Sequence, residues 1–154
     1  MEKQKIASID NLIPLFRERL ASGQSVCFSP QGTSMLPMLR QGIDSVVISP
    51  LPEKIKKYDI VLYQRESGQY VLHRVVEVKD TYTCMGDNQF VKEYGLKQEQ
   101  LIAVVTSFTR NKKSHKTNEI GYWVYCRLWY HSRLVRRFLR RCINWLKYHI
   151  GGKQ

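Results

Sequence analysis

A serine, a histidine and an aspartate occur in this order in three short motifs, and together these residue types can perform acyl transfer. Ser34 lies in Gly-Thr-Ser-Met-Leu-Pro, His73 in Tyr-Val-Leu-His-Arg-Val-Val, and Asp87 in Gly-Asp-Asn. In serine-type hydrolysis a hydroxyl attacks the carbonyl carbon, a histidine takes the hydroxyl proton and a carboxylate orients the histidine. The three motifs therefore predict a nucleophile, a base and an orienting acid.

Each motif taken alone also has a purely structural interpretation. Gly-Thr-Ser is an ordinary turn or cap, a histidine in an apolar strand is often a hydrogen-bonded core residue, and Gly-Asp-Asn is a turn signal. The alternation around the histidine places Val71, His73 and Val75 on one face of a strand. Burial among these β-branched neighbours should lower the pKa of His73, so that the neutral ring can accept a proton.

The elements that must position these motifs are predicted to be mainly strands. Helical spacing of apolar residues indicates one helix near the N-terminus that stops at Gly23. Apolar or alternating runs bounded by turn residues then predict six strands, at residues 25–28, 45–49, 59–63, 70–78, 81–85 and 101–108. Six strands with few helices between them favour a mainly antiparallel β core, either a small barrel or a sandwich. The short apolar segment Met35 to Leu39 could add a helical turn beside Ser34.

Length, composition and cysteine usage limit the class of protein. The 154 residues are enough for one folded core, and an apolar content of 43% is that of a globular chain. The four cysteines are widely spaced and form no metal-binding pattern, so we expect reduced thiols, no metal and no cofactor. We find no secretory signal and no window of about 20 apolar residues. A cytoplasmic location, with peripheral contact to the membrane, is therefore expected.

The positive charge is concentrated at the C-terminal end. Residues 1–109 carry 13 Lys or Arg against 12 Asp or Glu, whereas residues 110–154 carry 12 against one. We expect an N-terminal helix and a β-rich core followed by a linker and a basic, aromatic, helical tail, at residues 1–24, 25–109, 110–121 and 122–154.

The tail has the pattern of a basic amphipathic helix. Its apolar residues recur at helical spacing and its cations occupy intervening positions, at Arg127, Arg133, Arg136, Arg137, Arg140, Arg141 and Lys147. Trp129 and Trp145 are among its aromatic residues. Such a helix is attracted to an anionic membrane surface. Two alternatives remain open: the apolar stripe packs on the β core, or the basic face binds an acidic partner or nucleic acid. No nucleic-acid recognition motif is present, so no specific nucleic acid is expected.

Over roughly residues 25–109 the combination of motifs resembles the signal-peptidase-I family of serine endopeptidases. The resemblance rests on Ser-Met-Leu-Pro, the following Leu-Arg-Gln-Gly-Ile-Asp, Tyr-Asp-Ile-Val, His-Arg-Val-Val and Gly-Asp-Asn, in that order. Many bacterial members, and the related self-cleaving repressors, have a lysine as base. His73 at this position resembles the endoplasmic-reticulum and archaeal type instead.

The resemblance implies a role for each matching residue. Ser34 would be the nucleophile, His73 its base and Asp87 the acid that orients or tunes His73. Residues flanking the serine would form the oxyanion and substrate site, namely Gly32, Thr33, Met35 and Pro37. Many family members have a hydroxyl where this chain has Gly32, so either Thr33 or a backbone group replaces that donor or the site has one donor fewer.

The fold implied by the resemblance is the β-rich one of signal peptidases and self-cleaving repressors, with an extended substrate added as a strand. The expected function is removal of leader or signal-like segments from precursor peptides by Ser34 and His73. The family usually has an N-terminal membrane anchor, which this sequence does not show. The alternative is an inactive peptide-binding module that docks at membranes through its tail. A repressor's self-cleaving domain is disfavoured, because no helix-turn-helix precedes residue 25 and the base position is not lysine.

Overall fold

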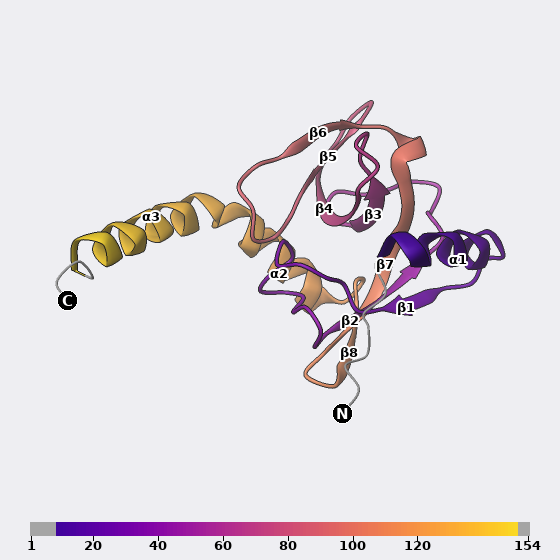
Figure 1. Cartoon of the computed structure of the whole chain (residues 1–154), viewed down its shortest axis with the longest axis horizontal. Coiled ribbons are helices and arrows are strands. Elements are labelled where there is room, and N and C mark those ends of the chain that lie inside the picture. The colour runs from indigo at the N-terminus through magenta and orange to yellow at the C-terminus, as the bar shows by residue number, and fades with distance from the viewer. Residues whose placement is uncertain (1–8, 151–154) are drawn as a thin grey trace. The chain divides into compact units, whose positions relative to one another are not determined.

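The computed structural model describes residues 9–150, without the side chains of Asp10, Leu146, Lys147 and Ile150. It contains three α-helices, one short 3₁₀ helix and eight strands (Figure 1). The chain divides into two compact units, residues 1–119 and 120–154. The first unit holds all the strands and carries the three motifs.

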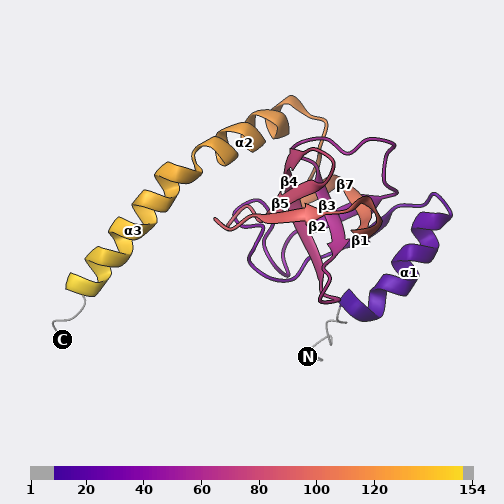
Figure 2. The ribbon, with the colours of Figure 1, turned by 90° about the horizontal axis from the view of Figure 1, so that it is seen from above.

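The first unit begins with helix α1 (Ile9–Ala21), which confirms the predicted helix. The turn that follows it contains Gly23, whose φ of +75° is the left-handed conformation that glycine adopts readily. The amide of Gln24 closes the turn by donating to the carbonyl of Arg19 at 2.9 Å. The helix lies beside β1 (Figure 2), and the Phe16 ring is 5.2 Å from that of Phe28.

The strands form one antiparallel sheet. They are β1 (Val26–Phe28), β2 (Ser45–Ser49), β3 (Ile60–Gln64), β4 (Tyr70–Val78), β5 (Tyr82–Met85), β6 (Glu93–Leu96), β7 (Leu101–Arg110) and β8 (Lys113–Lys116), with the 3₁₀ helix η1 (Gln98–Gln100) before β7. The order is β1-β2-β7-β3-β4-β5-β6, and β8 also pairs with β7. The predicted antiparallel β core is confirmed. Among these strands β1 and β6 stand at the two ends of the order, so the sheet does not close, and of the two predicted forms the barrel is wrong.

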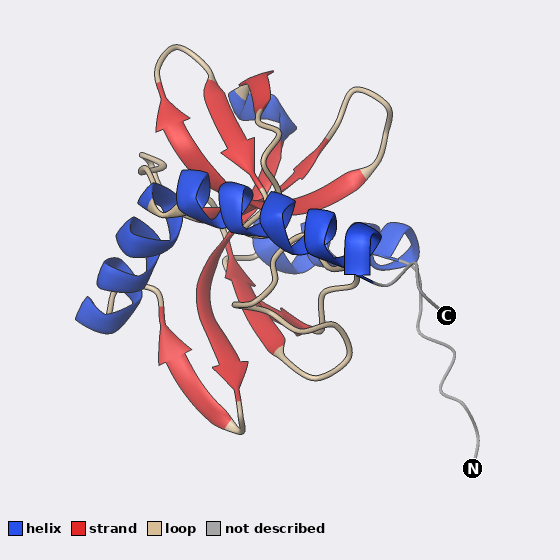
Figure 3. Ribbon diagram, turned by 90° about the vertical axis from the view of Figure 1, so that its left-hand side faces the viewer, coloured by secondary structure: helices blue, strands red, loops and turns tan. Residues whose placement is uncertain are grey.

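The sheet twists strongly, and Figure 3 shows its strands fanning in different directions. Long strand β7 lies inside the sheet and pairs with three strands, with β2 on one side and with β3 and β8 on the other. One face carries an apolar cluster, formed by Ile55, Val61, Tyr63, Val71, Val75, Cys84, Leu96, Leu101 and Val104. The His73 motif lies in β4, between two members of this cluster.

Two strands were not predicted, and both have unusual sequences. β8 falls inside the predicted linker, where Asn111 and Lys112 form a tight turn with positive φ after β7. Its sequence, Lys-Ser-His-Lys, lacks an apolar alternation, yet the His115 ring stacks on Phe108 at 5.3 Å. β6 contains a glycine and only one buried residue, Leu96. The stretch after β7 is thus a β-hairpin rather than an irregular linker.

The second unit consists of helices α2 (Ile120–His131) and α3 (Arg133–Ile150). They meet at Ser132, where the helical hydrogen bonds continue: the Ser132 amide donates to Leu128 and the Arg136 amide donates to Ser132, each at 2.9 Å. In the described part of the chain, no helix combines the length and apolar character needed to cross a bilayer.

Candidate active site

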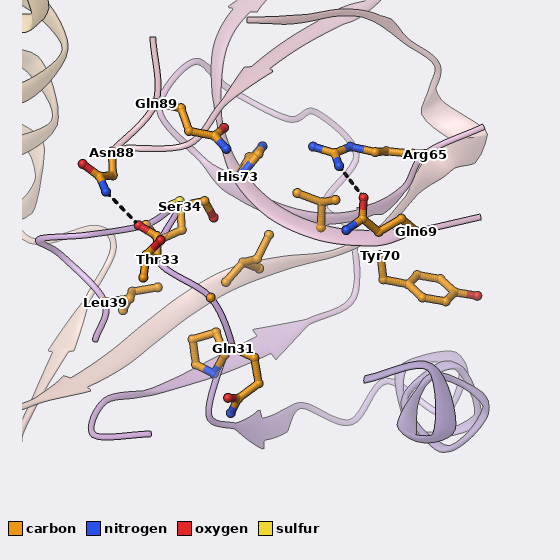
Figure 4. A pocket seen from close by; sticks show the side chains of 15 residues that line it. Gln31, Thr33, Ser34, Leu39, Arg65, Gln69, Tyr70, His73, Asn88 and Gln89 are labelled. Atoms are coloured by element: carbon orange, nitrogen blue, oxygen red, sulfur yellow. Dashed lines mark hydrogen bonds between the residues drawn. The ribbon is translucent and has the colours of Figure 1, made fainter. Parts of the chain in front are cut away.

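Ser34 and His73 line the same cavity of about 400 Å³ (Figure 4). The cavity lies between the segment Pro30–Met35, which follows β1, and the first half of β4. Asn88, the last residue of the Gly-Asp-Asn motif, and the following Gln89 form part of its wall. The fold therefore brings together two of the three predicted motif residues, although 39 positions separate them in the sequence.

The backbone after Ser34 forms turns, and one of them, closed between Leu39 and Met35, has the hydrogen-bond spacing of the single helical turn considered from the sequence. The Leu36 amide donates to the Thr33 carbonyl at 3.2 Å, and the Leu39 amide donates to the Met35 carbonyl at 2.9 Å. Gly32 has a φ of +90°, and its amide donates to Oε1 of Gln41 at 2.9 Å. Within the described residues, neither the amide nor the hydroxyl of Ser34 donates a hydrogen bond. Both groups are thus available to a bound ligand.

A buried carboxylate holds the far end of this loop. Asp44 accepts hydrogen bonds from the Arg40 amide at 2.9 Å and from the Arg40 guanidinium at 2.8–2.9 Å. The guanidinium also lowers the pKa of Asp44. The carbonyl of Asp44 accepts from the Ser29 hydroxyl at 2.8 Å, which joins the two ends of the loop that carries Ser34.

The Gly-Asp-Asn turn is attached directly to the Ser34 segment. The Asn88 amide donates to the Ser34 carbonyl at 2.8 Å, and its side chain donates to the Thr33 carbonyl at 3.2 Å. A Cβ on Gly86 would lie only 2.7 Å from the Ser34 carbonyl oxygen. Only glycine allows this approach of the two backbones. The motif therefore fixes the position of Ser34 through its backbone.

His73 is 1% exposed and lies on the apolar face of β4, opposite Val61 of β3. Its Nδ1 atom is 3.1 Å from the hydroxyl of Tyr63 and 3.2 Å from Oε1 of Glu93. Because the ring also lines the cavity, the fixed Nδ1 leaves Nε2 as the nitrogen that can serve a ligand there.

Glu93 is the carboxylate nearest to His73, and it was not among the predicted site residues. It belongs to β6, and Arg65 forms a two-point ion pair with it. Burial would raise the pKa of Glu93, but hydrogen bonds from Arg65 and Tyr63 outweigh burial and lower it. Burial, followed by Glu93, strongly raises the pKa of Tyr63. The ionised carboxylate of Glu93 can only accept hydrogen bonds, and the Tyr63 hydroxyl donates its own hydrogen to Glu93. Both neighbours therefore favour the His73 tautomer with hydrogen on Nδ1.

Burial lowers the pKa of His73 to about 4. Glu93 and Asp87 raise it and Arg65 lowers it further, but burial has the largest effect. The ring is consequently neutral at pH 7, as expected from its position among β-branched residues. Neutral imidazole with an unprotonated Nε2 is the state in which histidine acts as a base.

Asp87 forms its ion pair with Arg74 rather than with His73. Its carboxylate accepts from Nε of Arg74 at 2.8 Å and from Nη2 at 2.7 Å, and both side chains are almost fully buried. Arg74 also donates to the carbonyl of Tyr58 at 3.0 Å. Because Arg74 lies on the opposite face of β4 from His73, Asp87 does not occupy the orienting position at Nδ1 that was assigned to it. Tyr63 and Glu93 occupy it.

The structure separates the remaining predicted site residues. Gly32, Thr33 and Met35 line the cavity with Ser34, whereas Pro37 is exposed and does not line it. The residues considered for membrane contact all belong to the second unit. Arg127 and Trp129 lie in α2, and α3 carries the rest, at Arg133, Arg136, Arg137, Arg140, Arg141, Trp145 and Lys147, of which the Lys147 side chain lies outside the described residues.

The described side chains include no group of three or more His, Cys, Asp or Glu placed to hold a metal ion. Comparison of the chain with protein-family models, with curated proteins and with solved structures gave no match. Any assignment of function therefore depends on the residues of the cavity and their geometry.

Proposed function

We propose that the chain is a serine endopeptidase of the signal-peptidase type, with Ser34 as nucleophile and His73 as base. The observation that carries the proposal is one cavity that is lined both by Ser34, whose hydroxyl donates no hydrogen bond to a described residue, and by the neutral His73. The histidine is anchored through Nδ1 by Tyr63 and Glu93. A merely structural core histidine has no need to line a cavity.

The reaction follows from these positions. Nε2 of His73 takes the hydroxyl proton as Oγ of Ser34 attacks the peptide carbonyl, and the Ser34 amide donates to the developing oxyanion. The C–N bond then breaks, and His73 returns the proton to the leaving amine. Water, deprotonated in turn by His73, hydrolyses the acyl-Ser34 ester and releases the acid.

The second oxyanion donor would come from Thr33 or from a side-chain amide of the cavity wall. Gly32 supplies no hydroxyl, and its φ of +90° is a conformation that residues with a Cβ rarely adopt. Loss of one oxyanion donor costs an enzyme about 3 kcal/mol of transition-state stabilisation. A Thr33→Val variant separates the two sources, because it removes the hydroxyl and keeps the side chain's shape.

The proposed substrate is an extended segment of a precursor peptide. Residues 70–73 of β4 pair with β3 on one side, while β5 pairs with β4 only from Arg74 onward. The other edge of residues 70–72 faces the cavity, across from residues 30–32. A peptide strand can add to such an edge through main-chain hydrogen bonds, which would carry its scissile bond toward Ser34. The same features support the signal-peptidase-like form of the fold.

One observation favours the alternative, an inactive peptide-binding module. The Ser34 hydroxyl makes no hydrogen bond to His73. Catalytic hydrogen bonds are often long before a substrate binds, so a measurement of cleavage separates the two functions.

The test is digestion of a mixed library of short peptides, followed by mass spectrometry. The wild-type chain should cut a defined set of sites, and Ser34→Ala should cut none of them while keeping its circular dichroism. Ser67→Ala, an exposed serine in the β3–β4 turn, is the matched control and should behave as wild type. Binding of peptides by the wild type without any cleavage would leave the inactive module as the function.

A further inference from the structure

Helix α3 separates its residues into two halves, independently of the peptidase site. With 3.6 residues per turn, the apolar side chains occupy one half of the circumference. The described ones are Leu134, Val135, Phe138, Leu139, Cys142, Ile143 and Trp145. The other half carries Arg133, Arg136, Arg137, Arg140 and Arg141, with Asn144 and Tyr148. Helices of globular domains usually have mixed charges on the polar half. Here every charged side chain that the structure describes on this half is an arginine.

The apolar half of α3 is exposed. Leu134, Val135, Phe138, Leu139, Ile143 and Trp145 are each at least 51% exposed. Residues 120–150 contain no Asp or Glu, so no acidic side chain of this unit neutralises the arginines. Some arginines stack on aromatic rings instead, with Arg127 3.3 Å from the Trp123 ring and Arg136 3.6 Å from the Trp129 ring.

We propose that α3 binds in the plane of an anionic lipid bilayer surface. In this position the apolar half enters the boundary between headgroups and acyl chains, and the arginines contact lipid phosphates. The apolar half is then removed from water and the arginines are paired with phosphates, so the arrangement needs no acidic protein partner. The proposal concerns the second unit alone and does not depend on the proposed peptidase activity.

Other occupants satisfy only one half of α3. Nucleic acid would pair with the arginines and leave the six exposed apolar side chains in water. A second copy would cover the apolar half, but the arginine half would face away from it and would find no acidic side chain in residues 120–150 of either copy. An anionic bilayer is the one of these occupants that matches both the charge and the apolar area.

The test is co-sedimentation of the full chain with vesicles. Vesicles of equal parts phosphatidylglycerol and phosphatidylcholine should bind it, and vesicles of phosphatidylcholine alone should bind it far more weakly. Replacement of Arg137, Arg140 and Arg141 by Gln should weaken partitioning by about 100-fold, since each cation near such a surface contributes about a factor of five. The control, Lys54→Gln with Lys97→Gln and Lys113→Gln, removes the same charge from exposed positions of the first unit and should bind as wild type.

A second pair of variants tests insertion of the apolar half. Phe138→Ala with Leu139→Ala keeps helix propensity and should weaken partitioning by about ten-fold or more. Ile43→Ala with Val91→Ala truncates two exposed apolar residues of the first unit and should have no effect. Brominated lipids should quench tryptophan fluorescence in the wild type and less in Trp145→Phe.

Several results would overturn the proposal. They are a full chain that stays in the supernatant with anionic vesicles, equal binding to both vesicle types, or equal losses in the α3 variants and their controls. Sedimentation of a vesicle-free dimer that the Phe138 and Leu139 substitutions dissociate would assign the apolar half to a second copy. Binding of duplex DNA by a chain that ignores vesicles would assign the arginines to nucleic acid. None of these measurements uses cleavage. A result that overturns the membrane proposal therefore leaves the proposed peptidase function untouched.

Discussion

The ring of His73 receives opposing influences from its neighbours. Glu93 raises its pKa and Arg65 lowers it, but burial has the largest effect and brings it to about 4. In the folded chain the ring therefore remains a proton acceptor well below pH 6.5, the ordinary pKa of histidine. A base with so low a pKa is weak, but it is unprotonated throughout the physiological range.

The same shift makes the stability of the fold depend on pH. The unfolded chain binds a proton at His73 below about pH 6.5 and the folded chain does so only near pH 4, so stability falls as pH decreases between these values. From pH 7 to pH 5 we expect a loss of about 2 kcal/mol from this residue in the free energy of unfolding. Urea denaturation at the two pH values measures it. His73→Asn should remove this part of the pH dependence, and His115→Asn, at a partly buried position of β8, should retain it. An equal dependence in both variants would contradict the buried, neutral His73.

Glu93 tests the orientation of the histidine. We expect Glu93→Gln to reduce the rate of peptide cleavage by about 100-fold, because the amide no longer stabilises the imidazolium that forms during proton transfer. Glu99→Gln, an exposed residue of η1, should cleave at the wild-type rate. If the Glu93 variant retains full activity, the anchoring of His73 by this carboxylate has no catalytic role.

At the residue scale, the sequence predicted Ser34 and the face on which His73 lies, because both follow from local motifs. It did not predict Glu93 or Tyr63. Glu93 reaches His73 only because β6 pairs with β5, and β5 with β4. The pairing of β6 with β5 follows a long turn, and no local sequence pattern indicates it. Asp87 was assigned to the histidine since it stands in a recognisable motif, but the neighbouring arginine is its actual partner.

At the scale of elements, the Gly-Asp-Asn turn holds the loop of Ser34 against β4. The Asn88 amide binds the Ser34 carbonyl, and the buried pair of Asp87 and Arg74 ties the turn to the strand that carries His73. The Gly-Asp-Asn turn thus positions both Ser34 and His73. A change that disrupts this turn should also change the geometry of the cavity.

Removal of one partner of the buried pair should be costly. Asp87→Asn leaves the Arg74 charge without its counterion, and we expect a loss of about 3–5 kcal/mol in the free energy of unfolding. Asp80→Asn, in the exposed β4–β5 turn, is the control. Replacement of both partners, Arg74→Met with Asp87→Leu, should recover much of the loss, because no buried charge remains. A fully stable Asp87→Asn variant without cleavage activity would instead assign Asp87 to the catalytic machinery.

The positions of the strands in the sequence were predictable where the strands are apolar. The predicted bounds of β2 and β4 agree with the structure, since each has a clear alternation or apolar run between turn residues. β6 and β8 were missed because neighbouring strands, rather than their own sequences, stabilise them. The open form of the sheet was also not predictable, because closure depends on whether the end strands meet and no local pattern specifies that.

At the scale of the whole molecule, the concentrated positive charge and the candidate cavity belong to different units. Residues 1–119 carry 17 Lys or Arg against 13 Asp or Glu, and residues 120–154 carry eight cations and no acid. All residues lining the candidate cavity belong to the first unit. We therefore expect the second unit to determine where the chain binds and the first to determine what it cleaves.

This division gives a direct prediction. The variant with Arg137, Arg140 and Arg141 replaced by Gln should cleave an uncharged peptide in vesicle-free buffer at the wild-type rate, because its substitutions lie outside the cavity. Fluorescence of a quenched peptide measures that rate. The control Lys54→Gln with Lys97→Gln and Lys113→Gln should give the same value. A reduced rate in the arginine variant alone would mean that the second unit contributes to the peptidase site.

The most direct test of the central claim is to trap an acyl group on Ser34. An activated ester of an alanine-terminated peptide would transfer its acyl group to Oγ as its alcohol leaves, and mass spectrometry of the digested chain locates the added mass. We expect one acyl group on the peptide that contains Ser34, none in Ser34→Ala, and a much slower reaction in His73→Asn. Acylation at another residue, or the same labelling in all three chains, would contradict a Ser34 nucleophile activated by His73.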